Sequence, residues 1–148
     1  MAEVSTPTAP ESMAQALPCV FRSALFAQLA TCSLMAKRSL AEREVLMCRQ
    51  APAHMNCETL ERLFLERATF PLHLKPGSPM THATVMRLQA GGLQGLQQAV
   101  ATQTPEVHGM VQQAQRQFGS LSDLPWADIV AHMLAWQPRR RSPGKSSP

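Results

Sequence analysis

Tyrosine is absent from the 148 residues of this chain, and other aromatic residues are scarce, with five phenylalanines and two tryptophans. Sheets are rich in aromatic and β-branched residues, so a sheet-based fold is not indicated. The apolar volume must come largely from leucine, alanine, valine and nine methionines, a mixture that favours helices. We therefore expect an all-α fold: a small single-domain helical bundle of about five or six helices with a Pro/Gly-rich central loop.

Long hydrophobic runs are also missing. No window of about 18 apolar residues is present, so we expect no transmembrane helix. The first 12 residues contain two glutamates and neither lysine nor arginine, so the charged start of a signal peptide is lacking. We expect a cytoplasmic protein, and in that reducing compartment disulfides are uncommon.

Net basic charge is confined to the last ten residues. The chain has 14 basic and 10 acidic residues, and Arg139, Arg140, Arg141 and Lys145 account for the difference, since 14 − 4 = 10. The rest of the chain is neutral, so no basic nucleic-acid-binding face is indicated and no nucleic-acid partner is expected.

Recognisable catalytic motifs are lacking as well. The sequence has no P-loop, no G-x-G-x-x-G fingerprint and no paired-histidine motif. No general acid/base pair stands out either, and we do not expect an enzyme.

The pattern along the chain divides it into three parts. Residues 1–18 read as a flexible arm, residues 19–137 as a helical domain, and residues 138–148 as a disordered basic tail. Ser39-Leu-Ala-Glu42 is a capping-box signature for a helix that starts at Ser39, and Asn56 can cap the next one. Periodicity and caps predict helices over residues 20–37, 39–49, 57–69, 81–102, 105–118 and 125–137.

Three glycines interrupt the fourth of these helices. Gly91, Gly92 and Gly95 each cost up to about 1 kcal/mol relative to alanine inside a helix. Close approach of another backbone or of a ligand would explain them. The alternative is that the helix breaks at Gly91-Gly92.

The four cysteines are the most unevenly placed residues of the chain. Cys19, Cys32, Cys48 and Cys57 are separated by 12, 15 and 8 residues, and the 91 residues after Cys57 contain none. No C-x2-C knuckle is present, which weighs against structural zinc. An iron–sulfur cluster is larger than one ion, so its ligands can come from separate elements.

Helix positions suggest how these thiols meet. Cys48 is predicted in the last turn of one helix and Cys57 in the first turn of the next, where the helix dipole stabilises a thiolate. The turn at Pro52 would bring the two together. Cys19 and Cys32 would be roughly 20 Å apart on one straight helix. A shared site therefore requires that helix to begin later, with Ser23 as its cap and Cys19 on an arm that folds back.

These observations predict an iron–sulfur site with Cys19, Cys32, Cys48 and Cys57 as ligands. We expect a [4Fe–4S] rather than a [2Fe–2S] cluster, in a pocket ringed by apolar residues such as Phe21, Leu46 and Leu60. The role would be electron transfer, redox sensing or cluster delivery to a larger redox or cluster-accepting protein.

Two alternatives stay open for the cysteines. One is a structural zinc site, with His54 as a substitute ligand, although an exposed turn histidine is the simpler interpretation of His54. The other is that they are unligated core or redox thiols. The chain would then be a metal-free helical adaptor that binds a partner through its Met- and Gln-rich faces.

Overall fold

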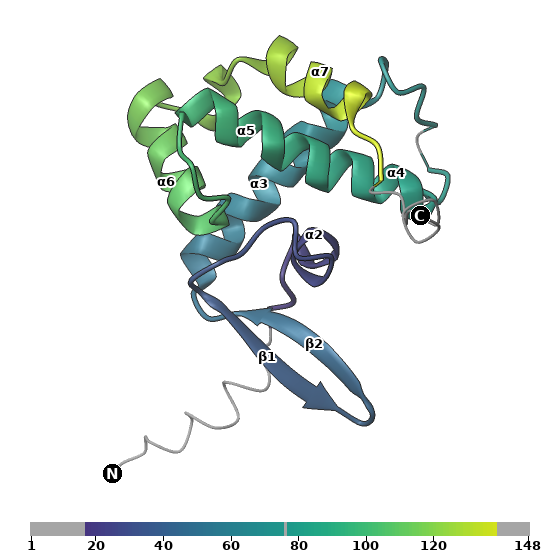
Figure 1. The fold of residues 1–148 in the computed structure, drawn as a ribbon, viewed down its shortest axis with the longest axis vertical. Coiled ribbons are helices and arrows are strands. Elements are labelled where there is room, and N and C mark those ends of the chain that lie inside the picture. The colour runs from purple at the N-terminus through teal and green to yellow at the C-terminus, as the bar shows by residue number, and fades with distance from the viewer. Residues whose placement is uncertain (1–16, 76, 139–148) are drawn as a thin grey trace, which may run out of the picture.

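The computed structural model describes residues 17–75 and 77–138. The expected arm, up to residue 16, and the expected tail from residue 139 lie outside these residues. The elements follow one another as α2 (Arg22–Phe26), β1 (Met35–Leu40), β2 (Arg43–Cys48), α3 (Ala51–Ala68), α4 (His82–Met86), a π-helical segment (Arg87–Gly91), α5 (Gly92–Val100), α6 (Val107–Phe118), a 3₁₀ turn (Leu121–Asp123) and α7 (Trp126–Ala135) (Figure 1).

The expectation of an all-α fold is wrong, because β1 and β2 form an antiparallel hairpin. Met35 lies opposite Cys48 and Leu40 opposite Arg43. The hairpin occupies the residues predicted as a helix with Ser39 as its cap. Hairpin pairing satisfies the backbone of both strands, and Leu46, only 2% exposed, packs into the core from β2. Figure 1 shows the hairpin extending away from the helices.

The first predicted helix is much shorter than expected. α2 ends at Phe26 rather than near Lys37, and Gln28 follows with a φ of 63°. A left-handed residue of this kind cannot continue a right-handed helix. Cys19 and Cys32 therefore do not share a helix, and the loop after α2 is free to return toward the hairpin.

α3 begins earlier than predicted. Pro52 lies in its first turn, where proline lacks only a hydrogen bond that the helix would not make. Asn56 is therefore inside the helix rather than its cap. Leu72, His73 and Leu74, which alternate like a strand, form a turn after α3 in which His73 has a φ of 55°.

The helix with three glycines does not break. It starts at the predicted residue, where the Thr81 side chain accepts a hydrogen bond from the Thr84 N–H. A Cβ on Gly91 would lie 2.7 Å from the Met133 Cα, and one on Gly95 would lie 2.8 Å from the Ile129 Cα. Gly91 and Gly95 thus allow the backbone of α7 to approach closely, as one of the two interpretations predicts, whereas Gly92 leaves room for the Phe64 ring.

The last two helices follow the prediction except at the start of α6, which begins at Val107 with Glu106 as its cap rather than at Pro105 after Thr104. α6 ends at Phe118, before Gly119 with a φ of 84°, and α7 begins directly after Pro125. Phe64 of α3, which is fully buried, joins these helices to the N-terminal part. Its ring centroid lies 5.8 Å from that of Phe21 and 5.9 Å from that of Trp126.

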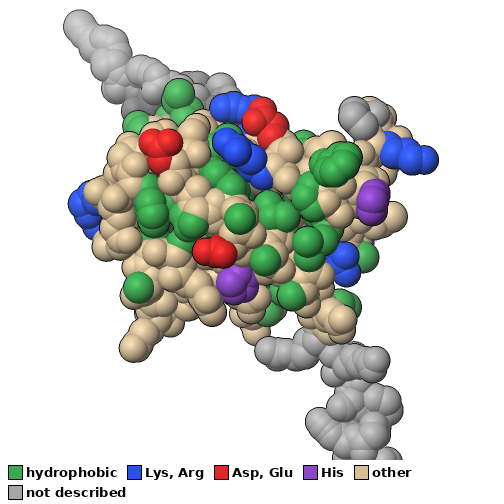
Figure 2. Space-filling view, turned by 90° about the horizontal axis from the view of Figure 1, so that it is seen from above, with side chains coloured by type: hydrophobic (Ala, Val, Ile, Leu, Met, Phe, Trp, Pro, Cys, Tyr) green, Lys and Arg blue, Asp and Glu red, His purple; other side chains and the backbone are tan. Residues whose placement is uncertain are grey.

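The outer face of the helices is sparsely charged. Viewed from the end at which α7 lies in Figure 1, apolar side chains form separate spots, with only a few charged groups between them (Figure 2). Within residues 17–75 and 77–138, no helix is both long and apolar enough to cross a membrane.

Candidate metal centre

Cys19 and Cys48 are brought together by backbone pairing. The segment Leu17–Cys19 runs along the free side of β2, where the Cys19 N–H donates to the Leu46 carbonyl (2.9 Å) and the Cys48 N–H donates to the Leu17 carbonyl (2.8 Å). Pro18 and Met47 form the bridge between these two bonds. Cys19 therefore does come back from an arm toward the other thiols, although through strand pairing rather than a helix end.

Cys32 lies in the loop between α2 and β1, which is held against the start of α6. The Thr31 N–H donates to the Pro105 carbonyl (2.9 Å), and the Val107 N–H donates to the Thr31 carbonyl (2.8 Å). The Glu106 carboxylate accepts from the Ser33 N–H at 2.7 Å and from the Gly109 N–H at 2.8 Å. One side chain thus caps α6 and fixes the residue after Cys32.

The Glu106 carboxylate is kept ionised by these contacts. Burial alone would raise its pKa, but the hydrogen bonds from Ser33 and Gly109, together with the charge of His108, outweigh that effect, and the net pKa is lowered. Sequence reasoning missed this residue, because its link to Ser33 spans 73 positions and leaves no local signal.

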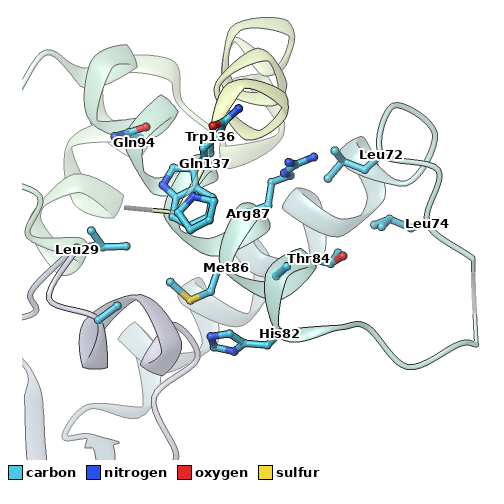
Figure 3. A pocket seen from close by; sticks show the side chains of 13 residues that line it. Leu29, Leu72, Leu74, His82, Thr84, Met86, Arg87, Gln94, Trp136 and Gln137 are labelled. Atoms are coloured by element: carbon cyan, nitrogen blue, oxygen red, sulfur yellow. The ribbon is translucent and has the colours of Figure 1, made fainter. Parts of the chain in front are cut away.

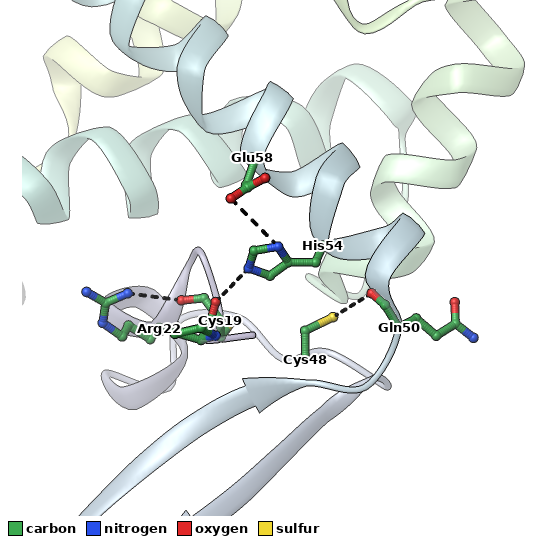
Figure 4. Close-up of polar contacts among 7 residues, drawn as sticks. Cys19, Arg22, Cys48, Gln50, His54 and Glu58 are labelled. Atoms are coloured by element: carbon green, nitrogen blue, oxygen red, sulfur yellow. Dashed lines mark hydrogen bonds and ion pairs between the residues drawn. The ribbon is translucent and has the colours of Figure 1, made fainter. Parts of the chain in front are cut away.

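Cys48 and Cys57 are placed differently from the prediction. Cys48 ends β2 rather than a helix, and its thiol donates to the Gln50 carbonyl at 3.4 Å (Figure 4). Cys57 lies in the second turn of α3, since the helix begins at Ala51. The expected stabilisation of a Cys57 thiolate by the helix N-terminus is therefore wrong.

All four cysteines line one small cavity of about 20 Å³. Of the three apolar residues expected around it, Phe21 is in the lining, whereas Leu46 and Leu60 are buried in the core behind it. The cavity brings together four segments that are separate in the sequence: the strand-like segment before α2, the loop after α2, the end of β2 and α3. Besides the cysteines, its lining comprises Val20, Phe21, Leu25, Met35, Met47, His54 and Val107.

The pKa values of Cys19 and Cys57 are raised chiefly by burial and in part by neighbouring thiols. Burial raises the pKa of Cys57 to about 12, and repulsion by Cys32, Cys19 and Cys48 adds to the increase. Burial likewise raises the pKa of Cys19, to which Cys32 and Cys48 also contribute. Cys19 and Cys57, whose pKa values are both raised, therefore keep their protons at neutral pH.

The pKa of Cys32 is shifted by neighbouring groups that act in opposite directions. Burial raises its pKa most, and Glu106 and Cys48 add to the increase. Hydrogen bonds from the backbone N–H groups of Leu34 and His108 act in the opposite direction. Donors of this kind stabilise negative charge on sulfur, and such groups around a metal-bound thiolate tune the metal.

His54 is a buried residue of α3 rather than an exposed turn histidine, with 9% of its surface accessible. Its Nε2 lies 2.9 Å from the Pro18 carbonyl oxygen, and its Nδ1 lies 3.8 Å from a carboxylate oxygen of Glu58 (Figure 4). An N–H at Nε2 donates to that carbonyl. His54 thus fixes the backbone beside Cys19 against α3. The sequence shows only that a histidine lies between two cysteines, so this contact could not be predicted from it.

The thiols surround the cavity without converging on a point. In the part of the chain that the structure describes, no three cysteine, histidine, aspartate or glutamate side chains come close enough together to hold a single metal ion. Comparison with known proteins identifies no relative: no family model, no curated protein and no solved structure matches this chain.

Proposed function

We propose that Cys19, Cys32, Cys48 and Cys57 bind a [4Fe–4S] cluster, and that the protein acts in electron transfer, redox sensing or cluster delivery to a larger partner. The observation that carries the proposal is the shared cavity, to which four separate segments each bring one cysteine. Ordinary packing of four cysteines does not require them to meet. Four thiolates around one pocket are the usual ligand set of such a cluster.

The placement of the thiols around a cavity favours a cluster over a single zinc ion. Around zinc, bonds of about 2.3 Å in a tetrahedron place sulfurs about 3.8 Å apart, in mutual contact. Around a four-iron cluster they lie about 6–7 Å apart, because the cluster separates them. A cavity between the thiols, with no group in the described residues that converges on one ion, agrees better with the wider arrangement.

The small volume of the cavity sets a condition on this proposal, because about 20 Å³ is room for about one water molecule. A volume of about 20 Å³ describes the space left when every neighbour is kept at non-bonded distance. An iron–thiolate bond of about 2.3 Å is more than 1 Å shorter than a non-bonded contact of about 3.5 Å. Short bonds of this kind bring only the irons close to the thiols, whereas the sulfides of the core stay at non-bonded distance from the apolar lining, so cluster binding requires that lining to move outward.

The charge of a cluster suits the electrostatics of the pocket. Bound metal supplies the positive charge that the neutral thiols lack and lowers their pKa, so that binding releases protons. The apolar walls would then limit the solvent exposure of the cluster, and the N–H groups near Cys32 would hydrogen-bond to its thiolate. Both are determinants of the reduction potential of a cluster.

The test is to purify the protein without oxygen and to measure its absorbance, iron, sulfide and zinc on one sample. We expect brown protein with about four iron per chain. One zinc per chain would replace the proposal by a structural zinc site. A colourless, metal-free and fully folded protein would end it.

A pair of variants separates ligation from packing. Cys57→Ser should lose the cluster, because it removes one of four ligands. Met35→Leu changes another residue of the same cavity with nearly conserved volume, and should keep it. Equal loss of iron in both variants would mean that the cavity lining, rather than the thiolate, was decisive.

A second candidate function, the metal-free adaptor, is favoured by a different feature. A hollow of about 830 Å³ lies between the end of α2, the turn after α3, α4 and residues 136–138 (Figure 3). Apolar side chains such as Leu29, Met86 and Trp136 line it together with Arg87 and His82, and no acidic residue is among its described lining. If the protein is metal-free, this hollow is the first place to search for a bound partner, by following Trp136 fluorescence.

A further inference from the structure

A second pocket lies beside the thiol cavity and shares three of its cysteines. Cys32, Cys48 and Cys57 line both hollows, whereas Cys19 lines only the inner one. The second pocket has a volume of about 170 Å³, far larger than that of the cavity. The three shared cysteines therefore form the partition between a small inner cavity and a larger outer pocket.

The two sides of this partition differ in chemistry. Apart from the cysteines and His54, the described lining of the cavity is apolar. The outer pocket is bordered by four side-chain amides and one imidazole, which belong to Gln50, Asn56, Gln112, Gln115 and His108. Such groups hydrogen-bond to water or to a polar ligand, and they carry no fixed charge that would bind an ion tightly.

The thiol of Cys48 already faces this outer side. It donates a hydrogen bond to the Gln50 carbonyl, and Gln50 belongs to the rim of the outer pocket. Gln112 is exposed on α6 and Asn56 is half-buried on α3, so the pocket opens between these two helices. An incoming metal centre can therefore reach three thiols from one direction without separating the strands that hold Cys19.

We propose that the outer pocket is the passage through which a cluster enters and leaves the thiol cavity. This inference rests on the proposed function and names the substrate of its cluster-delivery form: a [4Fe–4S] core that carries external thiolate ligands. Each protein thiol forms an iron–sulfur bond as one external thiolate leaves, and the proton of the protein thiol goes to the departing thiolate. The exchange therefore needs neither oxidant nor reductant.

The geometry also fixes an order of exchange. Cys32, Cys48 and Cys57 bind first, because they border the passage. Cys19 binds last, because its segment is held by hydrogen bonds to β2 on the other side. Release follows the same order of accessibility, with the three passage-side bonds attacked first and the bond to Cys19 last.

The first test uses metal-free protein and reads the passage directly. Iodoacetamide labelling is followed at each cysteine by mass spectrometry in the wild type and in Gln112→Trp and Asn56→Phe, which fill the pocket from its two walls. We expect labelling of Cys32, Cys48 and Cys57 to slow about tenfold, which corresponds to an added barrier of about 1.4 kcal/mol, while Cys19 is unchanged. Gln98→Trp, an exposed change on α5 that is outside this pocket, is the control.

The second test uses cluster-loaded protein. Transfer of iron to an excess of chelator should be about tenfold slower in Gln112→Trp and Asn56→Phe than in the wild type, with equal iron content at the start. Unchanged labelling of the three cysteines, or equal slowing at Cys19, would overturn the passage. A wild-type chain that takes up no cluster would instead overturn the proposed function, whatever the labelling shows. Melting curves that match the wild type establish that both variants are folded.

Discussion

The two halves of this protein follow their sequences to different degrees. From Thr81 onward, caps, glycines and prolines predict where the helices begin and end, and the structure agrees closely. Between Val20 and Cys57, the same reasoning predicts two helices where the structure has one short helix and a hairpin. Local sequence signals predict a helix well, because its backbone hydrogen bonds join residues close in the sequence. They fail where the backbone is instead satisfied by pairing with a distant segment.

The largest expected effect comes from the residue that joins the two halves. Phe64→Ala removes a fully buried ring between Phe21 and Trp126, and should reduce the free energy of unfolding by about 3–5 kcal/mol. Chemical denaturation measures the loss. Leu65→Ala, at a neighbouring side chain that is 38% exposed, should cost much less. Similar losses in the two variants would mean that the halves do not share this core.

A smaller loss is expected from the buried amide that holds the N-terminal half to the C-terminal one. The Gln89 carbonyl accepts from the Ala24 N–H at 3.1 Å, and its NH₂ donates to the Val20 carbonyl at 3.2 Å. Gln89→Met leaves both backbone groups without this partner, and should cost about 1–3 kcal/mol in denaturation. Gln98→Met, at an exposed position of the same long helix, should be nearly neutral. Equal stability of the two variants would contradict the role of Gln89.

The thiol cavity should make the stability of the metal-free protein dependent on alkaline pH. The pKa of Cys57 is raised to about 12, so above the ordinary thiol pKa the unfolded chain loses this proton while the folded chain keeps it. The contribution is complete below about pH 9 and is lost progressively as the pH rises toward 12. Denaturation series at several alkaline pH values should show this decline, and Cys57→Ala should make it shallower. A decline of unchanged slope in the variant would contradict a buried, neutral Cys57.

The smallest expected effect is the change in stability caused by Ala41→Gly, whose sign differs between the predicted helix and the observed hairpin. Ala41, in the turn of the hairpin, has a φ of 56°, which costs a non-glycine residue about 1–2 kcal/mol. Ala41→Gly relieves that strain at the expense of chain entropy, and should stabilise the protein by at most about 1 kcal/mol. In a helix the same change would destabilise by up to about 1 kcal/mol. Thermal melting of Ala41→Gly decides between the helix and the hairpin. Glu42→Gly, at a residue without a positive φ, is the control.

Parts of the candidate site could be predicted from the sequence, but the means of assembly could not. Clustering of the cysteines before residue 58 predicts a shared pocket, and all four line one. The elements that carry Cys32 and Cys48 were predicted wrongly, because α2 ends at Phe26 and because the hairpin does not use the capping signature of Ser39 and Glu42. Cys57 lies on a helix as predicted, but that helix begins earlier, at Ala51. His54 and Glu106 could not be assigned, since their partners Pro18 and Ser33 are 36 and 73 positions away.

The sequence by itself determined the helices from Thr81 to Ala135, because their ends depend on caps, prolines and glycines within a few residues of each boundary. It also determined that the thiols are confined to one part of the chain. Only the tertiary structure decided that a strand-like segment before α2 pairs with β2, and that the loop of Cys32 is held by Glu106. These contacts join segments far apart in the sequence, and no local pattern records which distant backbone group satisfies a given hydrogen bond.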